Sequence, residues 1–179
     1  MIEQAENIEA SVTEEDLKAV MRRVPAAVTV VTACSASEKR GMTVGSFTSV
    51  SLDPLLVSFN VGKAAGMHGV LIDADYFYVH LLAEEQAELS NLFARPDLDG
   101  EEQFSGVPHR LADDGAPILT EALSYLKCEK IVVYDAGDHV LMLGRVEDVV
   151  QMREGKPLLY FDRGYRSVGE PVDVSGSAD

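Results

Sequence analysis

Short apolar runs rich in β-branched and aromatic residues recur along the chain, and turn-forming residues separate them. Seven such runs lie at residues 26–34, 41–52, 55–61, 76–82, 125–134, 139–149 and 158–161. Several of the connections are too short for a parallel crossover, so the strands they join must run antiparallel. Strands do not alternate with long helices and no internal repeat is present. The pattern therefore favours a closed or nearly closed antiparallel barrel over a doubly wound sheet.

Helical signals occur in three segments. Thr13 is followed three residues later by Asp16, which is the pattern of a capping box, and apolar residues then recur at helical spacing. This helix is predicted to end near Pro25. Two further short helices are predicted at residues 64–72 and 84–94. The chain is thus expected to be mainly β with short helices.

Turn-forming residues mark the connections between the runs. Residues 38–41 predict the turn that returns the first strand into the second, and Asp53 with Pro54 ends that second strand. With the strand that follows, this predicts a meander of three antiparallel strands. Residues 135–138 predict a tight hairpin. Residues 97–117 are the least regular and predict a long loop, a feature that in compact domains is more often functional or mobile than a simple connector.

Length and charge bound the class of protein. The 179 residues, 46% apolar and 25% charged, fit one globular domain at residues 13–166, with a flexible acidic arm at 1–12 and a disordered tail at 167–179. The net charge of −15 argues against binding to nucleic acid or to an anionic membrane. No apolar run approaches the length that spans a bilayer, and the first residues lack the pattern of a signal peptide. We therefore expect a cytoplasmic protein.

The spacing of cysteines and histidines indicates no metal site. Cys34 and Cys128 lack C-x-x-C spacing and are expected to be reduced thiols that are fully or partly buried, with a disulfide as the alternative. The four histidines lie in four separate segments. His68 and His109 have no partner at the spacing of zinc ligands, so no structural metal is expected.

The stretch from Gly41 to Pro54 combines five hydroxyl side chains and two glycines with the apolar spacing of a strand. Such a strand can pack into a core through its apolar side chains while its hydroxyl and backbone N–H groups bind a planar, anionic ligand. An ordinary strand with solvated hydroxyls fits the same composition. The chain has no G-x-G-x-x-G fingerprint after its first strand and no P-loop, so a nicotinamide nucleotide would bind without a Rossmann domain.

Several pieces of the sequence, taken in order, resemble the flavin reductase-like family, the small NAD(P)H-using components of two-component monooxygenases and their flavin-binding relatives. The pieces lie at residues 28–32, 41–59, 77–82, 137–139 and 157–165, and together they cover roughly residues 14–166. The resemblance implies an antiparallel split β-barrel of the FMN-binding type. It further implies a homodimer that binds FMN or FAD.

The resemblance also implies roles for individual residues. Family positions that hold the flavin ring and its phosphate or ribityl chain fall on Thr43, Ser46, Phe47, Thr48 and Ser51. The catalytic position beside the nicotinamide falls on His139, and an aromatic position near the flavin falls on Tyr165. As phosphate ligands we choose two of the basic residues at element ends, Lys63 and Arg166, over two others, Arg95 and Arg163. Taken singly, each residue also fits an ordinary structural role, such as a solvated hydroxyl, a solvated charge or a histidine beside a turn.

His80 departs from the family pattern. Many members have Asn at this position in F-x-V-N-x-L, whereas this chain has His. An amide donates from nitrogen and accepts at oxygen, while a neutral imidazole donates at one ring nitrogen and accepts at the other. The sequence leaves open whether this position contacts the flavin or serves the fold.

The leading functional hypothesis is an NAD(P)H:flavin oxidoreductase. It transfers a hydride from NADH or NADPH to FMN or FAD and supplies the reduced flavin to a partner oxygenase. A different class is a flavin-binding electron carrier or storage protein without NAD(P)H turnover, because a split barrel can hold flavin and still lack a nicotinamide site. A barrel for an unrelated apolar ligand is the third alternative.

Overall fold

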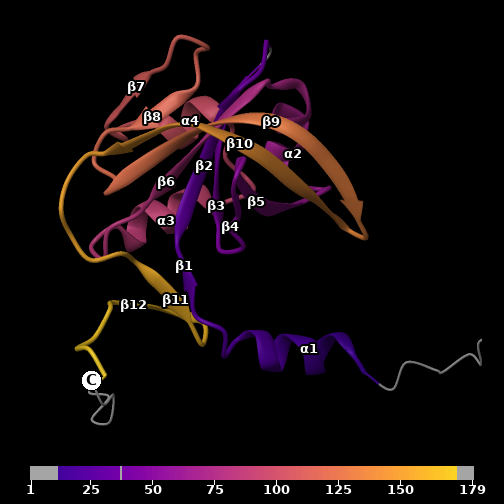
Figure 1. The fold of residues 1–179 in the computed structure, drawn as a ribbon, viewed down its shortest axis with the longest axis vertical. Helices are drawn as coiled ribbons and strands as arrows, with labels where there is room; N and C mark the ends of the chain where they lie inside the picture. The colour runs from indigo at the N-terminus through magenta and orange to yellow at the C-terminus, as the bar shows by residue number, and fades with distance from the viewer. Residues whose placement is uncertain (1–11, 37, 173–179) are drawn as a thin grey trace, which may run out of the picture.

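A seven-stranded antiparallel sheet dominates the computed structural model, which describes residues 12–36 and 38–172 (Figure 1). Its strand order is β3-β2-β6-β9-β10-β5-β4. The expected fold class, mainly β with antiparallel sheets and short helices, is confirmed. The strands are β2 (Thr29–Cys34), β3 (Lys39–Val44), β4 (Thr48–Leu52), β5 (Leu55–Gly62), β6 (Tyr76–Leu81), β9 (Ser124–Ala136) and β10 (His139–Gln151).

The two edge strands, β3 and β4, are consecutive in sequence and joined by residues 45–47 alone. Seven strands laid flat would separate the edges by about 29 Å, whereas this link reaches at most about 14 Å. The sheet must therefore curl into an open barrel whose two edges approach each other at the link. The prediction of one strand through Gly41–Leu52 in a three-stranded meander is wrong, because the stretch forms both edges.

The first predicted turn is also displaced. Lys39 and Arg40 already pair with β2, opposite Cys34 and Ala33, so they belong to strand β3. The turn lies earlier, where the N–H of Ser35 donates to the carbonyl of Glu38 at 2.9 Å. The hairpin between β9 and β10 is as predicted, with Gly137 in the left-handed region at φ 69°.

The barrel interior is filled by apolar side chains from β2, β5, β6 and β10. Phe59 and Phe77 meet edge to face there, with ring centroids 5.1 Å apart. Helix α2 (Gly66–Asp73), close to its predicted position, contributes Met67 and Leu71 to the same core. Strand β6 is buried on both faces, because the hairpin of β7 (His109–Leu111) and β8 (Pro117–Leu119) contributes to a separate cluster that includes Tyr78.

Residues 97–117 are not the predicted loop. They contain α4 (Gly100–Phe104) and most of the β7–β8 hairpin, both of which lie against the barrel. These elements could not be predicted, because a five-residue helix and three-residue strands contain too few apolar positions to produce a helical or strand-like hydrophobic pattern. Helix α3 (Ala87–Phe93) is shorter than predicted and packs Phe93 against Phe104 of α4.

Helix α1 (Glu14–Met21) begins as predicted, with Thr13 and Asp16 forming both bonds of a capping box, and ends before the predicted Pro25. None of its residues is buried, and Figure 1 shows it extending away from the barrel. Beside it lies a small sheet of β1 (Ala26–Ala27), β11 (Leu159–Phe161) and β12 (Gly164–Arg166). The predicted acidic arm, apart from Val12, and most of the predicted tail lie outside the described residues.

The cysteines and the helix lengths can also be compared with the sequence. Cys34 is half-buried and Cys128 fully buried, and both are free thiols, as expected. None of the helices in the described ranges is long and apolar enough to cross a bilayer.

Candidate functional site

The link between β3 and β4 places hydroxyl groups at the opening of the barrel. The Oγ of Ser46 accepts a hydrogen bond from the N–H of Asn60 on β5 at 2.9 Å, while Phe47 packs against the core. Beyond them, Thr48 is exposed on β4, and the Oγ of Ser51 accepts from the N–H of Asp53 at 3.2 Å. The chain is therefore anchored at Ser46 and Phe47 and leaves the Thr48 side chain open to a ligand.

His139 opens strand β10 directly opposite Gly62 on β5. Its Nδ1 lies 2.8 Å from Oδ1 of Asp138, and this contact is the main cause that holds the pKa of the Asp138 carboxyl below its ordinary value. The pairing with a carboxylate places the proton on Nδ1. The other ring nitrogen, Nε2, lies on the Gly62 side, only 3.7 Å from where a Cβ on Gly62 would be.

Lys63, which follows the end of β5, contacts the β9–β10 hairpin. Its N–H donates to the carbonyl of Asp138 at 2.9 Å, and its Nζ forms an ion pair with Asp135 at 2.7 Å. The β9–β10 hairpin and the end of β5 are thus fixed to each other. The Lys63 ammonium is half-exposed and remains accessible to a ligand beside His139.

Strand β5 contacts both the hydroxyl link and the histidine. Ser46 bonds to the N–H of Asn60 on one side of β5, and His139 of β10 pairs with Gly62 on its other side, two residues further along the strand. The sequence-predicted residues Ser46, Lys63 and His139 therefore all lie near the same end of β5.

Thr43 and Tyr165 are engaged elsewhere. The Thr43 hydroxyl donates to the carbonyl of Ser90 at 2.7 Å. The Tyr165 hydroxyl lies 2.9 Å from Oγ of Ser90 and 2.8 Å from Oδ1 of Asn91. Both side chains therefore fasten α3, to β3 and to the C-terminal hairpin respectively. Arg166 is exposed and bonds to its neighbour's carbonyl, and no contact brings it to Lys63 among the residues described.

A small cavity of about 250 Å³ lies beside Thr43, between β3, α2 and the end of α3. Arg40 and Arg95 line it, and the Arg40 guanidinium lies over Gly66, where a Cβ would be 2.5 Å from Nη1. Because residues 38–41 were predicted to form a turn, the position of Arg40 on strand β3 was not anticipated. Both cations already have acidic partners, Arg40 with Glu38 at 3.1 Å and Arg95 with Asp97 at 2.6 Å. A phosphate bound here would have to replace these partners.

His80 serves the fold. It is fully buried, its Nδ1 lies 3.0 Å from the carbonyl of Val30, and its Nε2 accepts from the N–H of Leu119 at 3.2 Å. These partners require the neutral tautomer with the proton on Nδ1. Burial lowers the pKa of His80 to about 4. The imidazole thereby joins β2, β6 and the β7–β8 hairpin.

Comparison with known proteins gives a consistent result. Residues 21–169 match the model of the flavin reductase like domain. A flavin reductase of Pseudomonas putida is 35% identical over 90% of this chain and 94% of its own. The reductase component of a 4-hydroxyphenylacetate 3-monooxygenase from Thermus thermophilus is 38% identical over 88% of this chain and 99% of its own. A Streptomyces globisporus NADH:FAD oxidoreductase, solved with NAD and FAD fragments, superposes with a TM-score of 0.81 at 36% identity over 89% and 94% of the two chains.

Proposed function

Because the chain belongs to the flavin reductase-like family, we propose that Ser46, Thr48, Lys63 and His139 form the site of its reaction. The protein is an NAD(P)H-dependent flavin reductase. When bound there, FMN or FAD would supply the acceptor for the hydride of NADH or NADPH. The observation that supports this site is that Ser46 and His139 lie on the two sides of β5, near the same end of the strand.

The residues present suit a flavin. The exposed hydroxyl of Thr48 and the backbone beside it can donate to the polar edge of a planar ring, where reduced flavin carries added electron density. Gly45 keeps this opening free of a side chain, since a Cβ there would meet only Ala26 at 3.6 Å.

His139 orients the nicotinamide. With its proton fixed on Nδ1 by Asp138, its Nε2 is a hydrogen-bond acceptor that can take an N–H from the carboxamide. Lys63 stands next to it as the local cation. Neither residue exchanges a proton with the flavin in this scheme, so each contributes through position and charge.

Replacing His139 by Ala tests the assignment. We expect NAD(P)H oxidation at limiting NAD(P)H to slow about tenfold, the loss of one hydrogen bond at the site, while flavin affinity stays within twofold of the wild type. Oxidation is followed at 340 nm with FMN or FAD supplied, and flavin affinity by fluorescence quenching. His68→Gln, on α2, is the matched control. Unchanged kinetics of His139→Ala would remove His139 from the site, and absence of NAD(P)H oxidation in the wild type would favour the carrier alternative.

The protein is further proposed to act as a homodimer. The supporting observation is apolar surface at the barrel edge and on α1, where Leu52 is 82% exposed, Leu55 50% and Leu17 59%. Such a surface on a folded chain is typical of an interface. The open flank of Thr48 lies on the same edge strand as Leu52, so a second copy covering that strand would also close the flavin site.

Oligomeric state is tested by sedimentation at micromolar concentration. Leu52→Glu should shift the protein toward monomer, because a carboxylate buried at an interface has no partner. Leu111→Glu is the control, since Leu111 is a comparably exposed leucine, at 56%, on the β7–β8 hairpin. A wild type that sediments as a monomer would contradict the proposal.

We propose that an oxygenase receives the reduced flavin, because the Thermus relative is the reductase component of a monooxygenase. The free thiols of Cys34 and Cys128 suit the reducing cytoplasm, where we place the reaction. Mixing the protein with a purified oxygenase component, NADH and flavin should yield hydroxylated product. Product formation that ceases when the reductase is omitted would identify the acceptor.

A further inference from the structure

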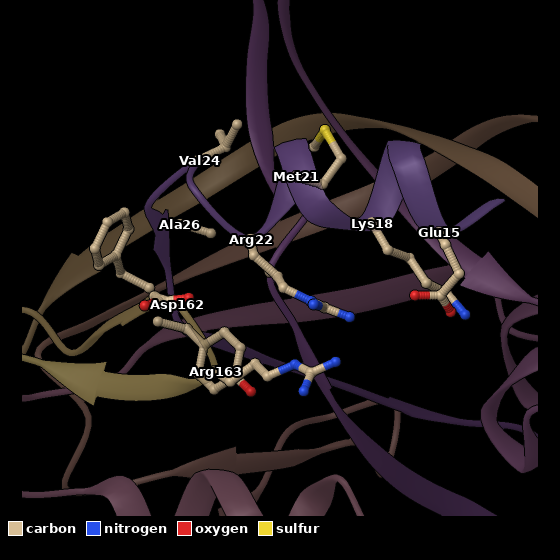
Figure 2. A pocket seen from close by; sticks show the side chains of 11 residues that line it. Glu15, Lys18, Met21, Arg22, Val24, Ala26, Asp162 and Arg163 are labelled. Atoms are coloured by element: carbon tan, nitrogen blue, oxygen red, sulfur yellow. The ribbon is translucent and has the colours of Figure 1, made fainter. Parts of the chain in front are cut away.

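A second, larger cavity lies outside the site described above. It measures about 550 Å³ and separates α1 from the β11–β12 hairpin (Figure 2). This volume falls in the range of about 300–1,000 Å³ that small-molecule sites occupy. Its wall includes Gly45, the residue that precedes Ser46, so the cavity adjoins the proposed flavin site.

The cavity is locally basic in a strongly acidic chain. Lys18, Arg22 and Arg163 line it together with only two acids, Glu15 and Asp162, whereas the whole chain has 30 acidic and 15 basic residues. Figure 2 shows the Arg22 and Arg163 side chains extending in the same direction into the space between helix and hairpin. Neither guanidinium has a hydrogen-bond or ion-pair partner within residues 12–36 and 38–172. Two unpaired guanidinium groups on one cavity favour an anionic ligand.

Helix α1 is arranged to present this charge. Glu15, Lys18 and Arg22 follow one another at three and four residues, so they share a face that lines the cavity. Leu17 and Val20 lie on the opposite face, which is the surface proposed to meet a second copy. The cavity and the proposed interface therefore use different sides of the same helix.

Arg163 lies in the turn of the β11–β12 hairpin and has an unfavourable backbone conformation. Phe161 pairs with Gly164, which leaves Asp162 and Arg163 as a two-residue turn with φ values of 47° and 59°. Both values are positive, as in a type I′ turn, where Gly or Asn is preferred. The N–H of Asp162 also donates to the carbonyl of Arg22 at 2.9 Å and fixes the turn to the end of α1. A guanidinium held at such a position suggests a functional reason for it.

We propose that this cavity binds the adenosine diphosphate moiety of a dinucleotide. Arg22 and Arg163 take the pyrophosphate, and Tyr160 and Phe161, which also line the cavity, supply aromatic surface for the adenine. Both FAD and NAD(P)H contain this moiety. The proposal rests on the proposed reductase function for the identity of the dinucleotide but not for the binding itself.

Titration calorimetry with ADP tests the binding directly. We expect Arg22→Gln and Arg163→Gln each to weaken ADP about tenfold, the effect of one charge-assisted hydrogen bond. Arg23→Gln is the matched control, because Arg23 is exposed at the same end of α1 but does not line the cavity. Arg163→Gly adds a second criterion, since glycine relieves the positive φ: its melting temperature should rise while ADP affinity falls, which misfolding cannot produce.

Two further measurements identify the source of the moiety. If it belongs to FAD, Arg163→Gln weakens FAD about tenfold and leaves FMN unchanged. If it belongs to the nicotinamide nucleotide, the same variant raises KM for NADH or NADPH with FMN as the flavin and leaves both flavin affinities unchanged. Equal ADP affinity in the wild type and Arg163→Gly, or equal weakening of FMN and FAD, would overturn the proposal. ADP binding without any NAD(P)H oxidation would retain it while refuting the reductase site.

Discussion

Acidification should weaken the fold through His80. The imidazole donates to Val30 and accepts from Leu119, so it must be neutral in the folded protein. Its pKa is about 4 when folded and near 6.5 in an unfolded chain. Between these values the unfolded chain binds one more proton than the native protein, and the free energy of unfolding must fall as pH falls. The difference of about 2.5 pKa units corresponds to about 3 kcal/mol, of which about 2 kcal/mol is lost by pH 5.

The surroundings of His80 offer an imidazolium no counter-charge. Tyr125 is its aromatic neighbour, with ring centroids 6.0 Å apart, and the guanidinium of Arg110 lies over the same tyrosine at 5.8 Å from its centroid. The hydrogen bond to the carbonyl of Val30 raises the pKa of His80, but burial lowers it by more.

Urea unfolding of the wild type and His80→Asn between pH 7.5 and 4.5 measures the effect. Asparagine keeps a donor and an acceptor but has no charge to gain, so the variant should be less stable at pH 7.5 by about 1–3 kcal/mol and lose less with acid. The wild-type profile should be steeper by up to about 1.4 kcal/mol per pH unit near pH 5. Carboxylates titrate in both proteins and cancel in the comparison, and His68→Gln should follow the wild type. Parallel profiles for the wild type and His80→Asn would refute the assignment of a neutral, buried imidazole.

Two substitutions test the packing and the anchoring of α3. Gly144→Ala places a Cβ against Cζ of Phe77 and should destabilise the barrel by about 1–3 kcal/mol in urea unfolding. Gly69→Ala, with nothing within 4 Å of the added Cβ, should stabilise α2 by up to about 1 kcal/mol. Equal effects of the two substitutions would contradict the tight contact at Gly144. Tyr165→Phe removes the hydroxyl that bonds at Ser90, so we expect about 1 kcal/mol less stability with unchanged flavin affinity. Weaker flavin binding at constant stability would instead place the Tyr165 hydroxyl on the flavin.

The fold class was readable because most strands carry their own signal. The β-branched and aromatic runs that became β5, β6, β9 and β10 each lie within two residues of prediction, and β2 begins three residues later than predicted. The capping box fixed the start of α1. The division of residues 41–52 into two edge strands was not readable. The local sequence predicted one strand there, because only the closure of the whole sheet decides that β3 and β4 become its opposite edges.

The sequence likewise predicted part of the candidate site. Ser46 and His139 were predicted from motifs far apart in the sequence, and the structure places both beside the same end of β5. Tyr165 and Thr43 matched motif positions equally well, yet their hydroxyls bond to α3. Arg40 was predicted in a turn, whereas it lies on strand β3 and pairs with Ala33 of β2. A motif identifies a residue type at a position, whereas the direction of the side chain depends on pairings that only the folded chain supplies.

Flavin binding and dimerisation should be coupled if the second copy closes the site. Thr48 and Leu52 lie on one edge strand, so covering Leu52 also shields the flank of a flavin at Thr48 from water. If dimerisation strengthens flavin binding, flavin binding must strengthen dimerisation by the same free energy. Apparent flavin affinity should therefore weaken on dilution below the dimer dissociation constant, and saturating flavin should shift sedimentation toward dimer. Leu52→Glu should bind flavin weakly at every concentration, while Leu111→Glu keeps the wild-type dependence. Flavin affinity independent of protein concentration across the dimer transition would show that each chain forms a complete site alone.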